Sequence, residues 1–528
     1  MARILVVEQI AEPGLELLRA AHDTEVRTGL SRDELTQLVA EGGWDALVTR
    51  SQTWVDAELL GAAGPRLSVI GVGSVGTDRI DVAAATRAGV MVINSPTGNT
   101  IAAAEHTMAL LLALARRIPA AEASLRAGEW QRGRYVGTEL RGKTLGIVGL
   151  GKIGKALARR ALGFEMRIIA FDPYLAAEQA AEFGARLVSF DELLAQADVV
   201  SVHTPGGDAT RSLIGREELA RTKRGAFILN AARGGIVDEH ALAAALVDGQ
   251  IGGAALDVYS REPPAPDNPL RSAPNTILTP HLGASTAEAQ ERVAVEMAEQ
   301  VLMALSGVTP PYAVNAPAVA ADVAPRLRPY VELAGRLGAL ARQLVEPPVE
   351  RLALTYAGEI GESDCTPLRS AALAAFLEGT TDERVNAVNA DLVARERGLS
   401  VRETKSDASE PWASLVTFEA GGVRLSGSTA HGRPHLAEVG GFAIDAELAG
   451  TILVTRHHDR PGIVGGIGTL LAEAAINISS LELSRLSARG EAMMFVTLDE
   501  PVPAAVLARA RSVDGILEAR VVELPPLG

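Results

Sequence analysis

The sequence predicts an α/β protein with two doubly wound parallel-sheet domains, an α+β segment and a small ferredoxin-like domain. Three observations support this prediction. Apolar runs of strand length alternate with helical patterns over roughly the first half of the chain. A glycine-rich turn joins a strand to a helix at residues 149–154. The C-terminal segment has the element order strand, helix, strand, strand, helix, strand, which is typical of a ferredoxin-like domain.

The bulk composition excludes several classes of protein. The chain has 528 residues, enough for about three or four domains. Its net charge of -15 argues against a nucleic-acid or anionic-membrane partner. One cysteine, Cys365, excludes an intrachain disulfide framework and fits a reducing cytosol. Residues 1–8 lack the long apolar core of a signal peptide, and we expect a cytoplasmic protein.

The first 97 residues read as a small parallel α/β unit. The apolar runs expected to form strands are 4–7, 46–48, 67–72 and 90–93. Helical patterns fall between them, for example at 13–21 and 31–40. Asn99 is a candidate cap for a long helix that ends near Arg117. That helix leads into the next unit, so the first domain is interrupted there.

The glycine turn carries the dinucleotide-binding fingerprint in its full context of strand, turn, helix and second strand. Gly149 permits the tight turn, Gly151 lets a pyrophosphate approach the backbone, and Gly154 allows close helix packing. The helix start, with Lys152 and Ile153, offers free N–H groups and partial positive charge. Asp172 ends the second strand, where a carboxylate meets ribose hydroxyls and repels a 2′-phosphate. NAD is therefore favoured over NADP.

Later strands of the second unit end in polar or glycine-rich segments. These strands are expected at 199–202, 226–229, 254–257 and 276–278. Ligands of open α/β sheets bind at the carboxyl ends of strands. The segments that follow these four strands should therefore face the same crevice as the glycine turn.

Three residues in these segments suit the oxidation of an alcohol that carries a carboxylate. His281 has a pKa suited to a general base near neutrality. Glu262, buried beside it, would raise that pKa and orient the ring. Arg233 offers the planar fork that matches a carboxylate. Each residue also has an ordinary structural interpretation. His281 fits a surface loop residue, Glu262 fits a solvated carboxylate, and Arg233 fits a partner of a backbone carbonyl.

The second half of the chain begins after a helical pattern at 285–305 and a break at 306–311. Residues 316–448 mix helical runs at 326–345, 367–377 and 386–397 with strands at 351–356, 414–418 and 423–426. No site motif is evident there. The His and Arg residues at 431–433 suit an anion, but a solvated turn is the favoured interpretation. The tail places strands at 451–455, 478–483, 492–498 and 517–522, with helices at 461–475 and 502–513.

Four motifs in order resemble the D-2-hydroxyacid dehydrogenase family. They are residues 148–154 with Asp172, then 230–238, 256–263 and 279–286. The resemblance implies that Arg233, Glu262 and His281 form the catalytic set. It further implies a cofactor site at Gly149, Gly151, Lys152, Ile153, Gly154, Asp172, Thr204, Ala231, Asp257 and Gly283. It implies a substrate domain of residues 1–97 and 282–312 around an NAD-binding domain of residues 98–281.

The loops at 48–53 and 71–81 resemble the substrate domain of family members that oxidise 3-phospho-D-glycerate to 3-phosphooxypyruvate in L-serine biosynthesis. The residues implied to bind substrate are Arg50, Ser74, Val75, Gly76, Arg233 and His281. Two positions depart from that pattern, because Val72 and Gln52 stand where many such enzymes carry arginine. We therefore consider Arg132, Arg134 and Lys143 as further phosphate ligands, although each is more typical of a solvated surface charge.

The rest of the chain resembles the large members of the family, with an intervening domain at 316–448 and an ACT domain at 451–528. The resemblance implies that His457, Asp459 and Asn477 bind serine across a dimer interface of a homotetramer. Asp459 also fits a simple helix cap before Pro461. No metal site is expected. Two alternatives remain open: a dehydrogenase of another 2-hydroxy acid, and an NAD-sensing relative without catalytic activity.

Overall fold

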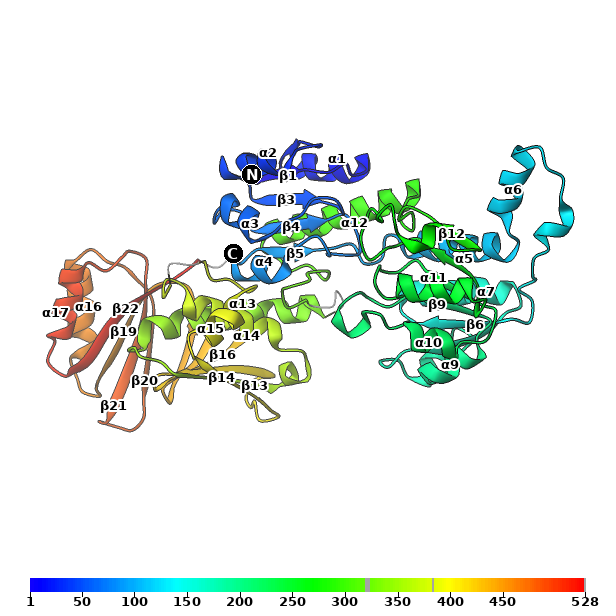
Figure 1. The fold of residues 1–528 in the computed structure, drawn as a ribbon. Coiled ribbons are helices and arrows are strands. Elements are labelled where there is room, and N and C mark those ends of the chain that lie inside the picture. The colour runs from blue at the N-terminus through cyan, green and yellow to red at the C-terminus, as the bar shows by residue number, and fades with distance from the viewer. Residues whose placement is uncertain (319–322, 382–383, 527–528) are drawn as a thin grey trace.

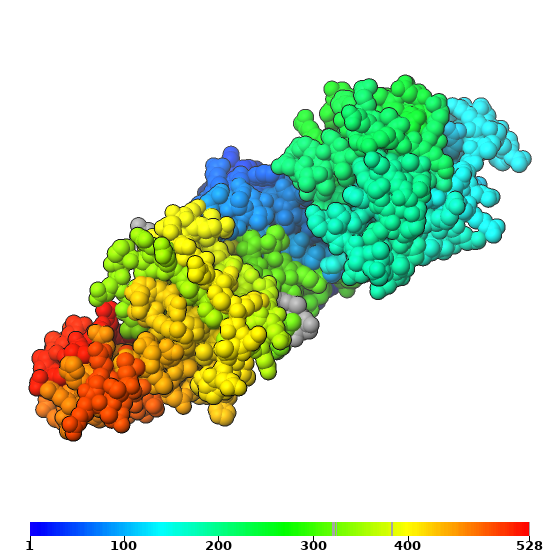
Figure 2. Space-filling view, turned by 90° about the horizontal axis from the view of Figure 1, so that it is seen from below, coloured from blue at the N-terminus to red at the C-terminus, as the bar shows by residue number. Residues whose placement is uncertain are grey.

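The fold consists of four β-sheets along an elongated molecule, in which the first sheet lies between the second and the third and the fourth lies at one end (Figures 1 and 2). The computed structural model describes residues 1–318, 323–381 and 384–526. Parts of the predicted third domain, 319–322 and 382–383, and of the fourth, 527–528, lie outside the described residues. None of the helices in the described ranges combines the length and hydropathy needed to cross a membrane.

The first sheet is parallel throughout, with strand order β2-β1-β3-β4-β5. Its strands are β1 (Arg3–Val6), β2 (Asp23–Val26), β3 (Ala46–Thr49), β4 (Val69–Val72) and β5 (Met91–Ile93). The covering helices are α1 (Glu12–Ala21), α2 (Arg32–Ala40), α3 (Ala57–Ala63), α4 (Val82–Arg87) and α12 (Ala287–Leu305).

Helix α12 returns to the first sheet from far along the sequence (Figure 1). Met297 and Val301 are fully buried against Val6 and Val48. A Cβ at Gly14 of α1 would lie 2.6 Å from a backbone oxygen of α12, so only glycine allows this close contact. The returning segment therefore completes the core of the first unit.

The second sheet is also parallel, with order β12-β11-β10-β9-β6-β7-β8. Its strands are β6 (Thr144–Val148), β7 (Arg167–Phe171), β8 (Ala185–Leu187), β9 (Val199–Val202), β10 (Ala226–Asn230), β11 (Ile251–Leu256) and β12 (Thr276–Leu278). Its helices are α5 (Thr100–Ala115), α7 (Lys152–Gly163), α8 (Ala177–Ala181), α9 (Phe190–Gln196), α10 (Arg216–Arg221) and α11 (Glu239–Val247). This order reverses direction between β6 and β9, where such sheets bind nucleotides.

Helix α5 begins where the sequence predicts, directly after Asn99, but the predicted cap is not made. The Asn99 side chain forms no capping hydrogen bond, and its Oδ1 is buried without a partner in the described structure. Beyond α5, helix α6 (Ile118–Arg126) and the 3-10 turn η1 (Arg132–Tyr135) form an arm that projects from the molecule (Figure 1).

The third sheet has order β14-β13-β15-β16-β17-β18 and is mostly antiparallel. Its strands are β13 (Arg351–Gly358), β14 (Ser400–Ser406), β15 (Ser414–Ala420), β16 (Val423–Ala430), β17 (Arg433–Val439) and β18 (Phe442–Glu447). Helices α13 (Ala324–Leu344), α14 (Thr366–Leu377) and α15 (Ala390–Glu396) complete this layer. Residues 431–432 turn between β16 and β17, as predicted, whereas Arg433 already begins β17.

The fourth sheet confirms the predicted ferredoxin-like order, β20-β21-β19-β22. Its elements are β19 (Gly450–His458), α16 (Ile463–Glu473), β20 (Ile478–Arg485), β21 (Glu491–Leu498), α17 (Ala504–Arg511) and β22 (Ile516–Leu524). One face packs on α16 and α17, and the other joins the core of the third sheet through residues such as Phe495 and Val522. Each predicted domain thus contains one sheet, and we keep the predicted boundaries as a proposal.

Candidate active site

A cavity of about 1260 Å³ opens between the first and second sheets. Loops after β1, β3 and β4 form one wall, and loops after β10, β11 and β12 contribute Arg233, Glu262 and His281 to the other. All of these loops follow the carboxyl ends of parallel strands, where ligand sites of α/β sheets lie. The structure therefore brings the three predicted catalytic residues to one cavity.

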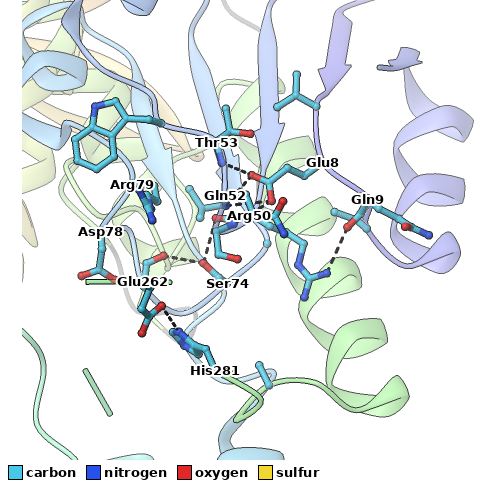
Figure 3. Close-up of a pocket in the computed structure, with 18 of the residues that line it drawn as sticks. Glu8, Gln9, Arg50, Gln52, Thr53, Ser74, Asp78, Arg79, Glu262 and His281 are labelled. Atoms are coloured by element: carbon cyan, nitrogen blue, oxygen red, sulfur yellow. Dashed lines mark hydrogen bonds and ion pairs between the residues drawn. The ribbon is translucent and has the colours of Figure 1, made fainter. Parts of the chain in front are cut away.

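His281 and Glu262 form the central pair of this cavity (Figure 3). The Nδ1 of His281 lies 2.8 Å from Oε2 of Glu262. This hydrogen bond raises the pKa of His281 above its ordinary value, although partial burial opposes the shift. Since Nδ1 faces the carboxylate, Nε2 is the nitrogen that can exchange a proton with a substrate. Glu262 is less buried than predicted, with 33% of its side chain exposed.

The pKa of Glu262 is lowered despite its partial burial. Desolvation by itself would raise this pKa, but hydrogen bonds from His281 and from the backbone N–H of Tyr259 outweigh it. Glu262 is therefore ionised at neutral pH, and a negative charge faces the ring of His281. This is the arrangement expected of a base held in position by a carboxylate.

Arg233 reaches from the second sheet to the first. Its Nε donates to Asp78 Oδ2 at 3.1 Å, and its Nη1 donates to the carbonyl of Ala232 at 2.7 Å. A Cβ at Gly76 would lie 2.3 Å from Nη2 of Arg233, so the guanidinium lies directly against that loop. The predicted carboxylate-binding fork is thus present, with one edge already paired to Asp78.

Asp257 supports the loop that carries His281. Its fully buried carboxylate accepts from the backbone N–H groups of Leu282 and Gly283, both at 2.8 Å. It also contacts Thr279 Oγ1 at 2.6 Å and the ring of His106 at 3.2 Å. Both oxygens face protein groups, so the structure gives Asp257 and Gly283 a role in holding this loop.

The glycine turn has the conformation that a bound dinucleotide requires. Gly149 adopts φ +91°, and a Cβ there would lie 2.8 Å from the carbonyl oxygen of His203. At Gly154 a Cβ would lie 2.4 Å from the carbonyl oxygen of Gly149. A Cβ at Gly151 meets nothing within 4 Å, which leaves the start of α7 open to an approaching phosphate.

Two further groups fit a nucleotide at this turn. The Oγ1 of Thr204 is buried and has no hydrogen-bond partner in the described part of the chain. A methyl group of Thr204 lies close to Gly149, so the hydroxyl of Thr204 lies beside the glycine turn. Asp172 accepts from the N–H of Leu150 at 2.9 Å, which places its carboxylate beside the turn. Lys152 and Ile153 begin α7, and Ala231 follows β10 at the same end of the sheet.

The loops of the first sheet supply the predicted substrate residues, since Arg50, Ser74, Val75 and Gly76 all line the cavity. The Oγ of Ser74 donates to the carbonyl of Gly76 at 2.7 Å, which fixes the shape of that loop. Arg132, Arg134 and Lys143 do not line the cavity. The two arginines lie on the projecting arm, and Lys143 precedes β6 at the opposite end of the sheet.

The structure separates the three residues predicted to bind serine. Asp459 follows the end of β19, whereas Asn477 precedes β20 near the start of β19, so they lie at opposite ends of the sheet. His457 is buried because strand alternation turns it inward, and it does not present a side chain to solvent. Asp459 pairs with Arg485, and Asn477 donates to Asp499.

Asp78 and Glu8 are among the cavity residues that were not predicted from sequence. Asp78 pairs with Arg233, and Glu8 accepts from the backbone N–H groups of Ser51, Gln52 and Thr53 (Figure 3). Glu8 could have been found by the carboxyl-end rule, because it follows β1 closely. No comparable signal marks Asp78, because its pairing depends on how the two sheets face each other.

The comparisons with known proteins agree with this geometry. Residues 108–283 match the NAD-binding domain of the D-isomer specific 2-hydroxyacid dehydrogenases. Residues 326–430 match the D-3-phosphoglycerate dehydrogenase intervening domain, and residues 451–515 match the ACT domain. The D-3-phosphoglycerate dehydrogenase of Synechocystis is 42% identical over 99% of this chain and 95% of its own length. The chain belongs to the D-3-phosphoglycerate dehydrogenase family.

Further relatives and solved structures are similar to this chain. The D-3-phosphoglycerate dehydrogenase of Bacillus subtilis is 39% identical over 99% of this chain and 100% of its own length. The TT0316 protein from Thermus thermophilus covers 59% of this chain and 99% of its own, with 39% identity and a TM-score of 0.55. A D-lactate dehydrogenase from Aquifex aeolicus, solved with NAD and lactic acid, covers 58% and 96%, with 28% identity and a TM-score of 0.51.

Family membership confirms the resemblance, the fold class and the cofactor predicted from the motifs. The second sheet belongs to an NAD-binding domain, and the protein is an NAD-dependent dehydrogenase. The tail is an ACT domain, a module that binds small molecules.

Proposed function

We propose that the protein oxidises 3-phospho-D-glycerate to 3-phosphooxypyruvate with NAD, the first step of L-serine biosynthesis. The observation that carries this proposal is the His281–Glu262 pair, 2.8 Å apart, in the same cavity as Arg233. The full-length relatives that carry the name D-3-phosphoglycerate dehydrogenase support the choice of substrate.

In this proposal each catalytic residue has one task. Arg233 holds the carboxylate of the substrate through its guanidinium. Nε2 of His281 takes the proton of the C2 hydroxyl as the carbonyl forms. Glu262 stabilises the resulting imidazolium, which is the protonated state favoured by its negative charge. Bound NAD supplies the acceptor for the hydride that leaves C2.

A substrate panel tests the choice of substrate. NADH formation is measured with 3-phosphoglycerate, D-glycerate and D-lactate at matched concentrations. The proposal expects the highest kcat/KM for the phosphorylated acid. Equal or higher activity with either of the other two acids would assign the enzyme to another 2-hydroxy acid.

We also propose that serine regulates the enzyme through the ACT domain. Asp459 and Asn477 carry this proposal, and the buried His457 is left out of it. Since these two residues lie at opposite ends of one sheet, a ligand can contact both only where two copies of the tail meet. The regulatory site therefore requires an oligomer.

A homo-oligomer is further supported by the projecting arm, and we propose a tetramer. Apolar side chains on and near α6 are exposed to solvent in the single chain, among them Ile118, Leu125, Trp130 and Val136. A second copy would bury them. We propose a cytoplasmic location, because the free thiol of Cys365 fits a reducing compartment. Light scattering coupled to size exclusion tests the oligomer, with a monomeric mass as the contradicting result.

A further inference from the structure

The cavity is lined by four arginines, and they differ in how far their charges are compensated. Arg32 donates to Asp56 at 2.5 Å and lies 3.5 Å from Glu58. Arg233 is paired with Asp78. In contrast, Arg50 and Arg79 have no carboxylate partner within the described ranges of the chain. Two uncompensated guanidinium groups therefore face a cavity that takes an anionic substrate.

One backbone anion site on this wall is already filled. Three consecutive N–H groups, those of residues 51–53, would form a nest for a phosphate. Glu8 already occupies them, with its carboxylate 2.8 Å from the N–H of Thr53 and 3.1 Å from that of Gln52. Burial by itself would raise the pKa of Glu8, but hydrogen bonds from the hydroxyl of Thr49 and from Thr53 outweigh it and lower the pKa, so the nest stays filled by a charged group. This nest is therefore closed to an incoming phosphate, whereas the side chains of Arg50 and Arg79 are open to it.

Arg79 is held in a defined place. Its guanidinium lies over the ring of Trp54, 5.8 Å from the centroid. Its backbone carbonyl accepts from the N–H of Val55 at 2.9 Å, and the next residue, Ile80, is buried. The stacking leaves the N–H donors of the guanidinium free for a ligand. Figure 3 shows Arg79 and Arg50 on opposite sides of Ser74.

We propose that Arg79 is a specificity-determining residue that binds the phosphate group of the substrate, with Arg50 as the second ligand. This inference rests on the proposed function. With the carboxylate on Arg233 and the hydroxyl at His281, the phosphate end of a three-carbon acid is left to the wall formed by the first sheet, where Arg50 and Arg79 line the same cavity. Arg79 follows Asp78 directly in the chain, and the side chain of Asp78 pairs with Arg233. The backbone at Arg79 therefore lies close to the proposed catalytic residues.

The test compares kcat/KM for 3-phosphoglycerate and for D-glycerate in the wild type and in Arg79→Gln. The variant should lose about tenfold or more with the phosphorylated acid, the size expected for one charge-assisted hydrogen bond. The loss should appear mainly in KM, and activity with D-glycerate should change less than about twofold. Arg79→Lys should recover part of the loss, because it keeps the charge but not the planar fork.

Arg87→Gln is the matched control, because it removes a charge from an exposed helical position outside the cavity. It should leave both substrates unaffected. Equal losses with both substrates in Arg79→Gln, or an unchanged preference, would overturn this inference alone. A wild-type enzyme without preference for the phosphorylated acid would overturn the proposed function as well.

Discussion

As the proposed base, His281 receives from Glu262 a higher proton affinity and a fixed ring orientation. The hydrogen bond between them raises the pKa of His281. Only the neutral ring can accept a proton, so activity should fall as the pH falls through this pKa. The acid limb of the pH profile should therefore lie above the pH expected for an ordinary histidine.

Glu262→Gln should move that limb to lower pH. The neutral amide no longer favours the imidazolium, so His281 stays deprotonated at lower pH. The measurement is the pH dependence of kcat/KM for both proteins. Glu217→Gln, at an exposed position in α10, is the control and should leave the limb in place. An unchanged limb in Glu262→Gln would refute the assigned role.

Among individual residues, the sequence predicted those that follow the ends of strands. It did not predict those whose contacts depend on how the first and second sheets face each other. Arg233, Glu262 and His281 could be found because the carboxyl-end rule and the family motifs both mark them. The pairing of Asp78 with Arg233 joins residues 155 positions apart, and no local pattern reports it. The buried position of His457 follows from strand alternation that runs further than the predicted strand.

The turn between β6 and α7 is the element on which cofactor binding depends. Its glycines serve two different purposes, which substitution can separate. Gly154 lies where helix and strand touch, and Gly151 lies where the helix start is open. The same change, glycine to alanine, should therefore have different consequences at the two positions.

Gly154→Ala should destabilise the fold, because its Cβ would lie 2.4 Å from a backbone oxygen. Overpacking of this kind costs about 1–3 kcal/mol, which thermal or chemical denaturation can measure. Gly151→Ala should keep wild-type stability but weaken NAD binding about tenfold, because the methyl group enters the space that a pyrophosphate approaches. Calorimetry measures that affinity, and equal effects at both positions would contradict this division.

Among the elements, apolar strands were predictable and polar edge strands were not. The strand at 199–202 agrees with its prediction residue for residue, because both of its faces are buried. Strand β2 reads Asp-Thr-Glu-Val at the edge of the first sheet, and β14 is mostly exposed at the edge of the third. Their backbone pairing stabilises them, and their side chains carry little apolar signal.

At the scale of the whole molecule, the third unit connects the regulatory tail to the substrate sheet. Arg384 donates to the carbonyls of Pro65 and Leu67, and Asn386 donates to that of Gly89. The core of the third sheet continues into the fourth through residues such as Phe495. The third unit thus joins the tail to the segments that precede β4 and β5, at the opposite end of the first sheet from the substrate loops.

Serine binding tests the regulatory half of the proposal. Asn477→Ala should weaken serine binding and raise the serine concentration needed for inhibition by about tenfold, with turnover in the absence of serine unchanged. Calorimetric titration and initial rates measure the two effects. Asn386→Ala, at the contact between units, is the comparison that should keep serine affinity. Unaltered binding in Asn477→Ala would remove that residue from the site.

In the proposed function His281, positioned by Glu262 beside Arg233, is the base on which turnover depends. The NADH progress curve of wild type and His281→Ala over many turnovers measures this role, with NAD affinity determined in parallel. The wild type should turn over repeatedly, and the variant should keep NAD binding but lose about a hundredfold or more in rate. A variant as active as the wild type, or a wild type that binds NAD without turnover, would contradict the account.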